Sequence, residues 1–181
     1  MILMSDHPSL ASLEFISYIN DAGQLPEELQ GKVGVYAIFD DQKILHFIGF
    51  SRDVFLSLRQ HLVRQPDRCY WLKVRTVDRP SRTILQETRD AWIAENGSTP
   101  TGNSTDEAKW NQAINVKELM TPEEQANYAD PYHDEVAQTK ILKNVARRIE
   151  AGILEGLRSR GIKADLRFNP KLKEEGLLDL K

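Results

Sequence analysis

Three side chains in the first half of the chain could do chemistry: Tyr36, His61 and Glu87. A phenol and an imidazole can transfer or orient protons, and a carboxylate with bound waters is a typical ligand set for Mg²⁺. Glu87 falls beside the apolar face of a predicted helix, where a partly buried carboxylate could meet a metal ion. Taken singly, each residue also has a structural explanation, as a cross-strand aromatic or as a helix-surface residue.

The elements that must position these residues can be read from periodicity. Two short alternating apolar runs, residues 33–39 and 44–50, flank a turn-rich Asp-Asp-Gln and predict a β-hairpin. A helix is predicted over residues 54–63, with Ser51 or Asp53 as its N-cap. Tyr36 therefore lies on a strand and His61 on a helix.

Further elements follow on both sides of the hairpin. A third strand is predicted over residues 69–77 and a helix over residues 81–95, which carries Glu87. Residues 96–106 are rich in Gly, Ser, Thr and Pro and predict a loop. Residues 8–21 have apolar side chains at helical spacing and predict an N-terminal helix. The expected fold class is α/β, a small mixed three-stranded sheet flanked by helices.

The hairpin carries the motif pair Gly34-Val35-Tyr36 and Phe47-Ile48-Gly49. Two strands are followed by a helix, with G-x-Y on the first strand and x-I-G at the end of the second. This arrangement resembles the GIY-YIG nuclease superfamily, over roughly residues 30–115. The resemblance implies a GIY-YIG-type fold and phosphodiester hydrolysis on DNA with Mg²⁺ or Mn²⁺.

The resemblance also implies roles for individual residues. Glu87 would hold the metal ion, and Tyr36 would act as a base or orient the attacking water. His61 would be a general base or a phosphate contact, and Asn103 would orient Glu87 or the substrate. Arg52 would contact phosphate. Tyr36, His61 and Glu87 are expected to converge on one concave surface of the sheet.

Two positions depart from the family pattern. Phe47 stands where the family has a tyrosine, and Ser57 stands where active members carry an arginine. Losing such a group typically costs about 10²–10³-fold in rate. Arg59 is on the same helix as Ser57 but points about 200° away, so Arg52 is the better substitute and Arg59 remains a candidate nucleic-acid contact.

A subgroup resemblance is more specific. The chain resembles the nuclease-like N-terminal domain of plastid monothiol glutaredoxins in three features. These are the segment FIGFSRD (47–53), Gly102-Asn103 shortly after Thr99-Pro100, and the serine at the arginine position. No CGFS-type glutaredoxin motif occurs, so this would be the stand-alone form. The expected organisation is an N-terminal helical segment (1–30), a GIY-YIG-like domain (31–118) and a helical, basic C-terminal extension (119–181).

The C-terminal extension is expected to be dominated by one long helix, residues 135–160, with a narrow apolar stripe. Residues 140–173 hold ten Lys and Arg against three acids. Arg147 and Arg148 are therefore candidate contacts to a nucleic-acid backbone. The alternatives are a solvated helix that pairs with acids of its own chain, self-association, or docking to a protein partner.

Composition limits the other possibilities. The 181 residues carry a net charge of −3 and a single cysteine, so the whole chain is no general nucleic-acid binder and has no intrachain disulfide. No apolar run reaches transmembrane or signal-peptide length, and we expect a cytoplasmic protein without a membrane partner. The leading expectation is a weak, metal-dependent DNA endonuclease. The alternative is a catalytically eroded module that binds nucleic acid or protein through its C-terminal helix.

Overall fold

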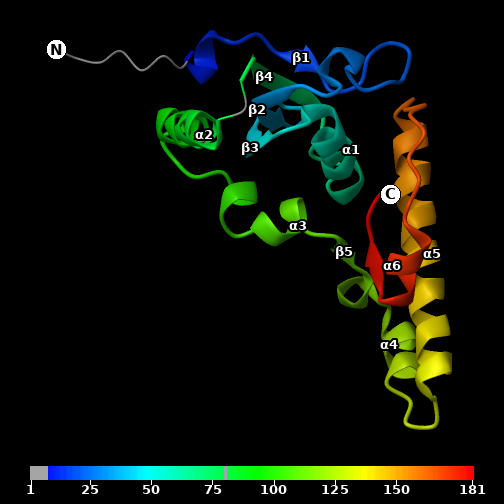
Figure 1. Ribbon diagram of the computed structural model, residues 1–181. Helices are drawn as coiled ribbons and strands as arrows, with labels where there is room; N and C mark the ends of the chain where they lie inside the picture. Colours follow the sequence, from blue (N-terminus) through cyan, green and yellow to red (C-terminus); the bar gives the residue numbers. More distant parts are fainter. Residues whose placement is uncertain (1–7, 80) are drawn as a thin grey trace. The chain divides into compact units, whose positions relative to one another are not determined.

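The computed structural model describes residues 8–79 and 81–181, and the chain divides into two compact units, Met1–Trp110 and Asn111–Lys181 (Figure 1). The first unit holds the predicted hairpin and the two helices around it. The second holds the long helix and the tail. Of the predicted N-terminal segment (1–30), residues 1–7 lie outside the described part.

A four-stranded sheet forms the centre of the first unit, with strand order β1-β4-β2-β3. Every neighbouring pair in it is antiparallel. The expected sheet was three-stranded and mixed, so that prediction is corrected on both counts, while the combination of sheet and helices is confirmed. The strands are β1 (Ile16–Ser17), β2 (Val33–Phe39), β3 (Leu45–Ser51) and β4 (Trp71–Val77).

The fourth strand comes from the segment expected to be a helix. The helix predicted over residues 8–21 is wrong, because after one 3₁₀ turn the chain runs as β1 along β4. The carboxylate of Glu95 accepts hydrogen bonds from the backbone N–H groups of Leu10 and Ala11, at 2.9 and 2.8 Å. Such contacts to distant elements outweigh the weak intrinsic helix preference of a short segment.

Helices of the first unit begin where their caps predict. α1 (Val54–Arg64) starts after Asp53, whose side chain accepts from the N–H of Leu56. α2 (Arg82–Asn96) starts after Ser81 and ends at Gly97, which has a left-handed φ of 83°. Short helices follow: η3 (Thr101–Asn103) and α3 (Glu107–Asn111). Another 3₁₀ turn, η2 (Glu27–Leu29), precedes β2.

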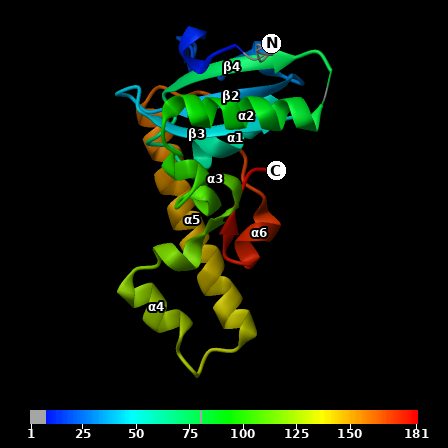
Figure 2. The same cartoon turned by 90° about the vertical axis from the view of Figure 1, so that its left-hand side faces the viewer.

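The two helices α1 and α2 cover opposite faces of the sheet (Figures 1 and 2). Residues alternate between the faces along each strand. Val35, Ala37 and Phe39 of β2 form one core cluster with Leu85 and Trp92 of α2. Their even-numbered neighbours therefore point to the α1 face.

The second unit is built on the long helix. α4 (Pro122–Tyr128) begins after Thr121, which forms a full capping box with Glu124. α5 (Glu135–Ser159) is followed by Gly161, which has a left-handed φ of 80°.

The tail after α5 contains short elements of its own. α6 (Pro170–Glu174) packs on α5, and β6 (Leu177–Leu178) pairs with β5 (Ile114–Asn115). The 3₁₀ helix η4 (Val116–Leu119) also contacts α5. These neighbours bury Leu142 and Val145 of the apolar stripe, while Val136 at its start stays 77% exposed.

None of the helices among the described residues combines the length and the apolar character needed to cross a lipid bilayer.

Candidate functional site

Tyr36 and His61 come together as the sequence predicted. The Tyr36 hydroxyl and His61 Nε2 lie 2.8 Å apart in a hydrogen bond. The strand β2 presents Tyr36 to the α1 face, and α1 presents His61 from its last two turns. Both residues are only 3% exposed, so the pair is part of the interior rather than of an open cleft.

The glycine of the second motif explains why the two motifs occur together. Gly49 is the cross-strand partner of Tyr36. A Cβ built at Gly49 would lie 2.8 Å from the Tyr36 hydroxyl and 2.6 Å from the Phe47 ring. Only glycine leaves room for the tyrosine ring to cross the neighbouring strand, and this packing requirement alone accounts for the spacing.

Aromatic rings close over the pair. Phe47, at the position of the family tyrosine, stacks on Trp110 with centroids 5.1 Å apart and planes 2° from parallel. The His61 ring lies 4.7 Å from that of Phe47 and 5.5 Å from that of Trp110. Arg64 at the end of α1 donates to the carbonyl of Trp110 at 2.8 Å and ties α3 to α1. The buried Trp110 ring thus helps to cover the Tyr36–His61 pair.

Ser57, at the position of the family arginine, is partly buried and joins the hydrogen-bond network of Tyr36. Its hydroxyl donates to Ser51 Oγ at 2.7 Å and lies in hydrogen-bonding contact with Tyr36. Ser51 in turn donates to the carbonyl of Asp53 and accepts from its N–H. The serine therefore fixes the turn between β3 and α1 instead of contacting a phosphate.

Burial sets the protonation of both groups. It raises the pKa of Tyr36 far above its usual value of 10, because the phenolate would lose its hydration. Burial, helped by the positive charge of Arg64, lowers the pKa of His61 to about 3 from its usual 6.5. Both groups are neutral near pH 7, and neither is poised to exchange a proton with a bound water molecule.

We expect Tyr36→Phe to lower the free energy of unfolding by about 1–3 kcal/mol, because it leaves the buried Nε2 of His61 without its partner. Urea unfolding followed by circular dichroism measures the change. The matched control is Tyr132→Phe, whose side chain is 94% exposed, and it should leave stability unchanged. Equal stability of wild type and Tyr36→Phe would contradict the buried hydrogen bond.

Acid should destabilise the first unit through His61. Between pH 6.5 and about 3 the unfolded chain binds a proton that the folded chain excludes, so stability falls as the pH falls through this window. The contribution is about 2 kcal/mol between pH 7 and pH 5. It is measured as the difference in pH dependence between wild type and His61→Asn. Identical pH profiles would show that His61 is not held neutral.

Glu87 does not join this pair. It lies on α2, which packs on the opposite face of the sheet, and its side chain is exposed, whereas Leu85 and Thr88 make the buried face of the helix. The expected convergence of Tyr36, His61 and Glu87 on one surface is therefore wrong. The expectation of a partly buried carboxylate is also wrong.

Asn103 has a structural role. Its side-chain oxygen accepts from the N–H of Ile48 at 2.8 Å, and its amide nitrogen donates to the carbonyl of Ile48 at 2.7 Å. The side chain thus takes the place of a further strand along the open edge of β3. It holds the loop after α2 on that edge rather than orienting Glu87.

Glu87 was the residue expected to hold Mg²⁺ or Mn²⁺, and its side chain is exposed on α2. Glu87 is separated from Tyr36 and His61 by the sheet. Within residues 8–79 and 81–181, no three His, Cys, Asp or Glu side chains form a group suited to a metal ion. A metal bound at Glu87 would have to complete its coordination with water and substrate oxygens.

An arginine-lined pocket lies on the α2 side, where β3 ends and α2 begins. It has a volume of about 250 Å³ and is lined by Phe50, Ser51, Arg52, Ser81, Arg82 and Leu85. Both arginines are exposed, and none of the lining residues that the structure describes is acidic. Arg52 was expected to contact phosphate, whereas Arg82 was missed. Arg82 could have been identified from the sequence, because it lies in the first turn of a predicted helix, where acidic residues are more usual.

The other arginines predicted to bind nucleic acid are differently placed. Arg59 is partly buried on α1. Arg147 is exposed on α5. Arg148 makes a two-pronged contact to the carboxylate of Glu124, at 2.6 and 3.0 Å, and also donates to the carbonyl of Leu119. This contact lowers the pKa of Glu124. Arg148 therefore links α5 to α4 within the second unit.

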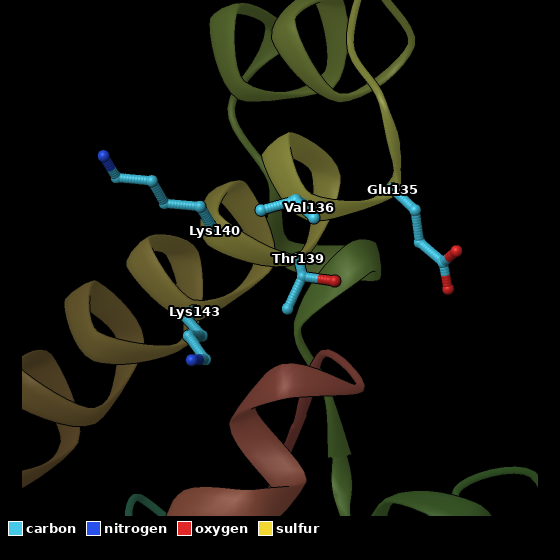
Figure 3. Close-up of a pocket in the computed structure, with 5 residues that line it drawn as sticks. All are labelled: Glu135, Val136, Thr139, Lys140 and Lys143. Carbon is cyan, nitrogen blue, oxygen red and sulfur yellow. The ribbon is translucent and has the colours of Figure 1, made fainter.

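A second hollow, of about 470 Å³, lies at the start of α5 in the second unit. Figure 3 shows its lining side chains, among them Val136 and two lysines. Lys143 pairs with Glu174 of α6 at 3.1 Å, and Lys173 of α6 pairs with Glu150. Several basic residues of the C-terminal region thus meet acids of their own unit.

Comparison with known proteins finds a partial relative. No family model matches the chain. Over 101 residues, 54% of this chain and 33% of the relative, it is 33% identical to a chloroplastic bifunctional monothiol glutaredoxin of Arabidopsis thaliana. The chain thus spans about a third of the length of that relative. The match confirms the predicted likeness to a plastid monothiol glutaredoxin, whereas membership of the GIY-YIG superfamily and a cytoplasmic location stay predictions.

Proposed function

We propose that the first unit is a nucleic-acid-binding module that takes a backbone phosphate between Arg52 and Arg82. The observation that carries this proposal is the pocket itself, with two exposed arginines and no acid among the described residues that line it. A guanidinium presents a planar fork of donors that matches phosphate geometry and stays charged at all physiological pH values. The pocket is therefore suited to an oxyanion.

The surroundings extend the positive charge beyond one phosphate. Arg89 of α2 lies over the Phe50 ring, 5.1 Å from its centroid, and also pairs with Asp90 at 3.2 Å. Arg75 of β4 donates to the side chain of Thr88 at 3.3 Å. Four arginines thus gather on the α2 side of the first unit. A polymer of phosphates suits such a group better than an isolated anion, because each further contact releases counterions.

The binding residues proposed here share Arg52 with the expected endonuclease but do not include Tyr36, His61 or Glu87. Tyr36 and His61 are neutral and sealed by Phe47 and Trp110, and the sheet separates them from Glu87. Removing positioned catalytic groups typically costs several orders of magnitude in rate. The first unit would accordingly bind nucleic acid without cleaving it. It would then be a catalytically eroded module, the alternative considered from the sequence.

Glutaredoxin chemistry, which the relative's name indicates, is not proposed for this chain. Its single cysteine, Cys69, is buried, with its sulfur 3.6 Å from the carbonyl of His61. A reactive thiol needs a partly exposed, positively charged setting that favours the thiolate.

A second candidate is an endonuclease that does not use Tyr36. It is favoured by the exposure of both Arg52 and Glu87 on the α2 side. Glu87 would hold Mg²⁺ or Mn²⁺, which would activate water, while Arg52 held the phosphate.

One assay separates the two candidates. Supercoiled plasmid is incubated with Mn²⁺ and highly purified full chain, and nicking and binding are followed on the same gel. We expect the plasmid to be retarded but nicked no faster by wild type than by Glu87→Ala. Metal-dependent nicking that Glu87→Ala abolishes would establish the endonuclease instead.

A further inference from the structure

The arginine pocket has an apolar wall as well as a charged one. Phe50 of β3 and Leu85 of α2 line it together with the guanidinium groups. Phe50 is only partly buried, although it packs against the core cluster on the α2 face. These two apolar side chains would not strengthen the binding of a phosphate alone, because a phosphate loses hydration against apolar atoms.

We infer that the pocket takes an unpaired base together with its phosphate, so that the unit prefers single-stranded over double-stranded nucleic acid. This inference rests on the proposed function and names its ligand class. The base lies against the Phe50 ring, and the adjoining phosphate lies between Arg52 and Arg82.

The physical reason is the accessibility of the base faces. In a duplex, the faces of the bases are covered by their neighbours in the stack, and only phosphates and groove edges meet a protein. In a single strand every base exposes a π face, and stacking on an aromatic side chain tolerates any sequence. The Arg89 guanidinium lies over the Phe50 ring, 5.1 Å from its centroid. A base that stacks on this ring therefore displaces Arg89, or stacks on the guanidinium plane, which also accepts bases.

The ligand rather than the protein can be varied to test this. Full-length protein is titrated at one salt concentration with an oligothymidylate of about 12 nucleotides, within the range of single-strand site sizes, a duplex of equal length, and an abasic strand with the same phosphates. We expect the oligothymidylate to bind about tenfold more tightly than either of the others, since one stacked base accounts for such a factor. Equal affinity of the oligothymidylate and the abasic strand would overturn the inference.

A pair of matched variants tests the wall. Phe50→Leu keeps an apolar side chain but removes the ring, and it should reduce binding of the oligothymidylate to the level of the abasic strand. Phe55→Leu, the same change at a partly buried position on α1, should bind like wild type. Thermal unfolding verifies that both fold, and unchanged single-strand preference in a folded Phe50→Leu would contradict the role of Phe50.

Failure of this inference can be told from failure of the proposed function. If all three ligands bind equally and Arg52→Gln weakens all of them, the phosphate site stands and the base site does not. If Arg52→Gln weakens none, the proposed function itself fails.

Discussion

The double variant Arg52→Gln with Arg82→Gln should reduce nucleic-acid affinity by about 10²-fold at low salt. Both side chains line the same pocket, and a hydrogen bond to a charged group typically contributes about 1.5–3 kcal/mol. The salt dependence should weaken as well, by about 0.7 in the log–log slope for each single-strand phosphate that the variant no longer neutralises. Fluorescence anisotropy at several salt concentrations measures both quantities.

The control for this variant removes the same charge elsewhere. Arg147→Gln with Lys163→Gln changes two exposed cations of the second unit. We expect its affinity and its salt slope to differ little from those of wild type. A larger reduction in this control than in the pocket variant would move the binding site to the C-terminal helix, where Arg147 and Arg148 were first predicted to act.

The substitution Trp110→Ala should destabilise the first unit by about 3–5 kcal/mol, the usual cost of removing a buried large aromatic side chain. Trp110 is 2% exposed and stacks on Phe47 above the Tyr36–His61 pair. Loss of the indole also opens His61 to water, so the pKa of this histidine should rise toward its ordinary value. Chemical unfolding and histidine NMR titration measure the two effects.

Tyr132→Ala serves as the matched control, since Tyr132 is an exposed aromatic residue and surface changes usually stay within about 0.5 kcal/mol. If Trp110→Ala were as stable as this control, the indole would not be packed on the pair. Tyr36 and His61 would then not be sealed from substrate.

Local signals in the sequence predicted local structure well. The caps Asp53, Ser81 and Thr121 placed the starts of three helices, since each satisfies N–H groups that the helix leaves free. Alternating apolar residues placed β2, β3 and most of β4. These features depend on neighbours in sequence, so periodicity and capping chemistry were sufficient to find them.

Features that depend on distant contacts were predicted poorly. The segment before η2 has helical spacing but is held as β1 by β4 and by Glu95. Likewise β6 exists only through its pairing with β5. A two-residue strand leaves no periodicity in the sequence, so it is visible only once its partner is in place.

The candidate site shows the same division. The meeting of Tyr36 and His61 was expected from the family resemblance, and the predicted strand and helix bring the two side chains together. The position of Glu87 did not, because it depends on which face of the sheet α2 covers, and a helix pattern does not specify that face. Arg82 and Phe50 meet Arg52 for the same reason, through the packing of α2 on the end of β3.

An amide NMR titration of the full chain with a short single-stranded oligonucleotide would locate the binding site residue by residue. We propose that nucleic acid binds at the Arg52–Arg82 pocket and not at the Tyr36–His61 pair. The largest shifts are therefore expected at residues 50–52 and 81–85, with little change at Tyr36 and His61. Shifts confined to the α5 arginines, or centred on His61, would contradict the proposed site.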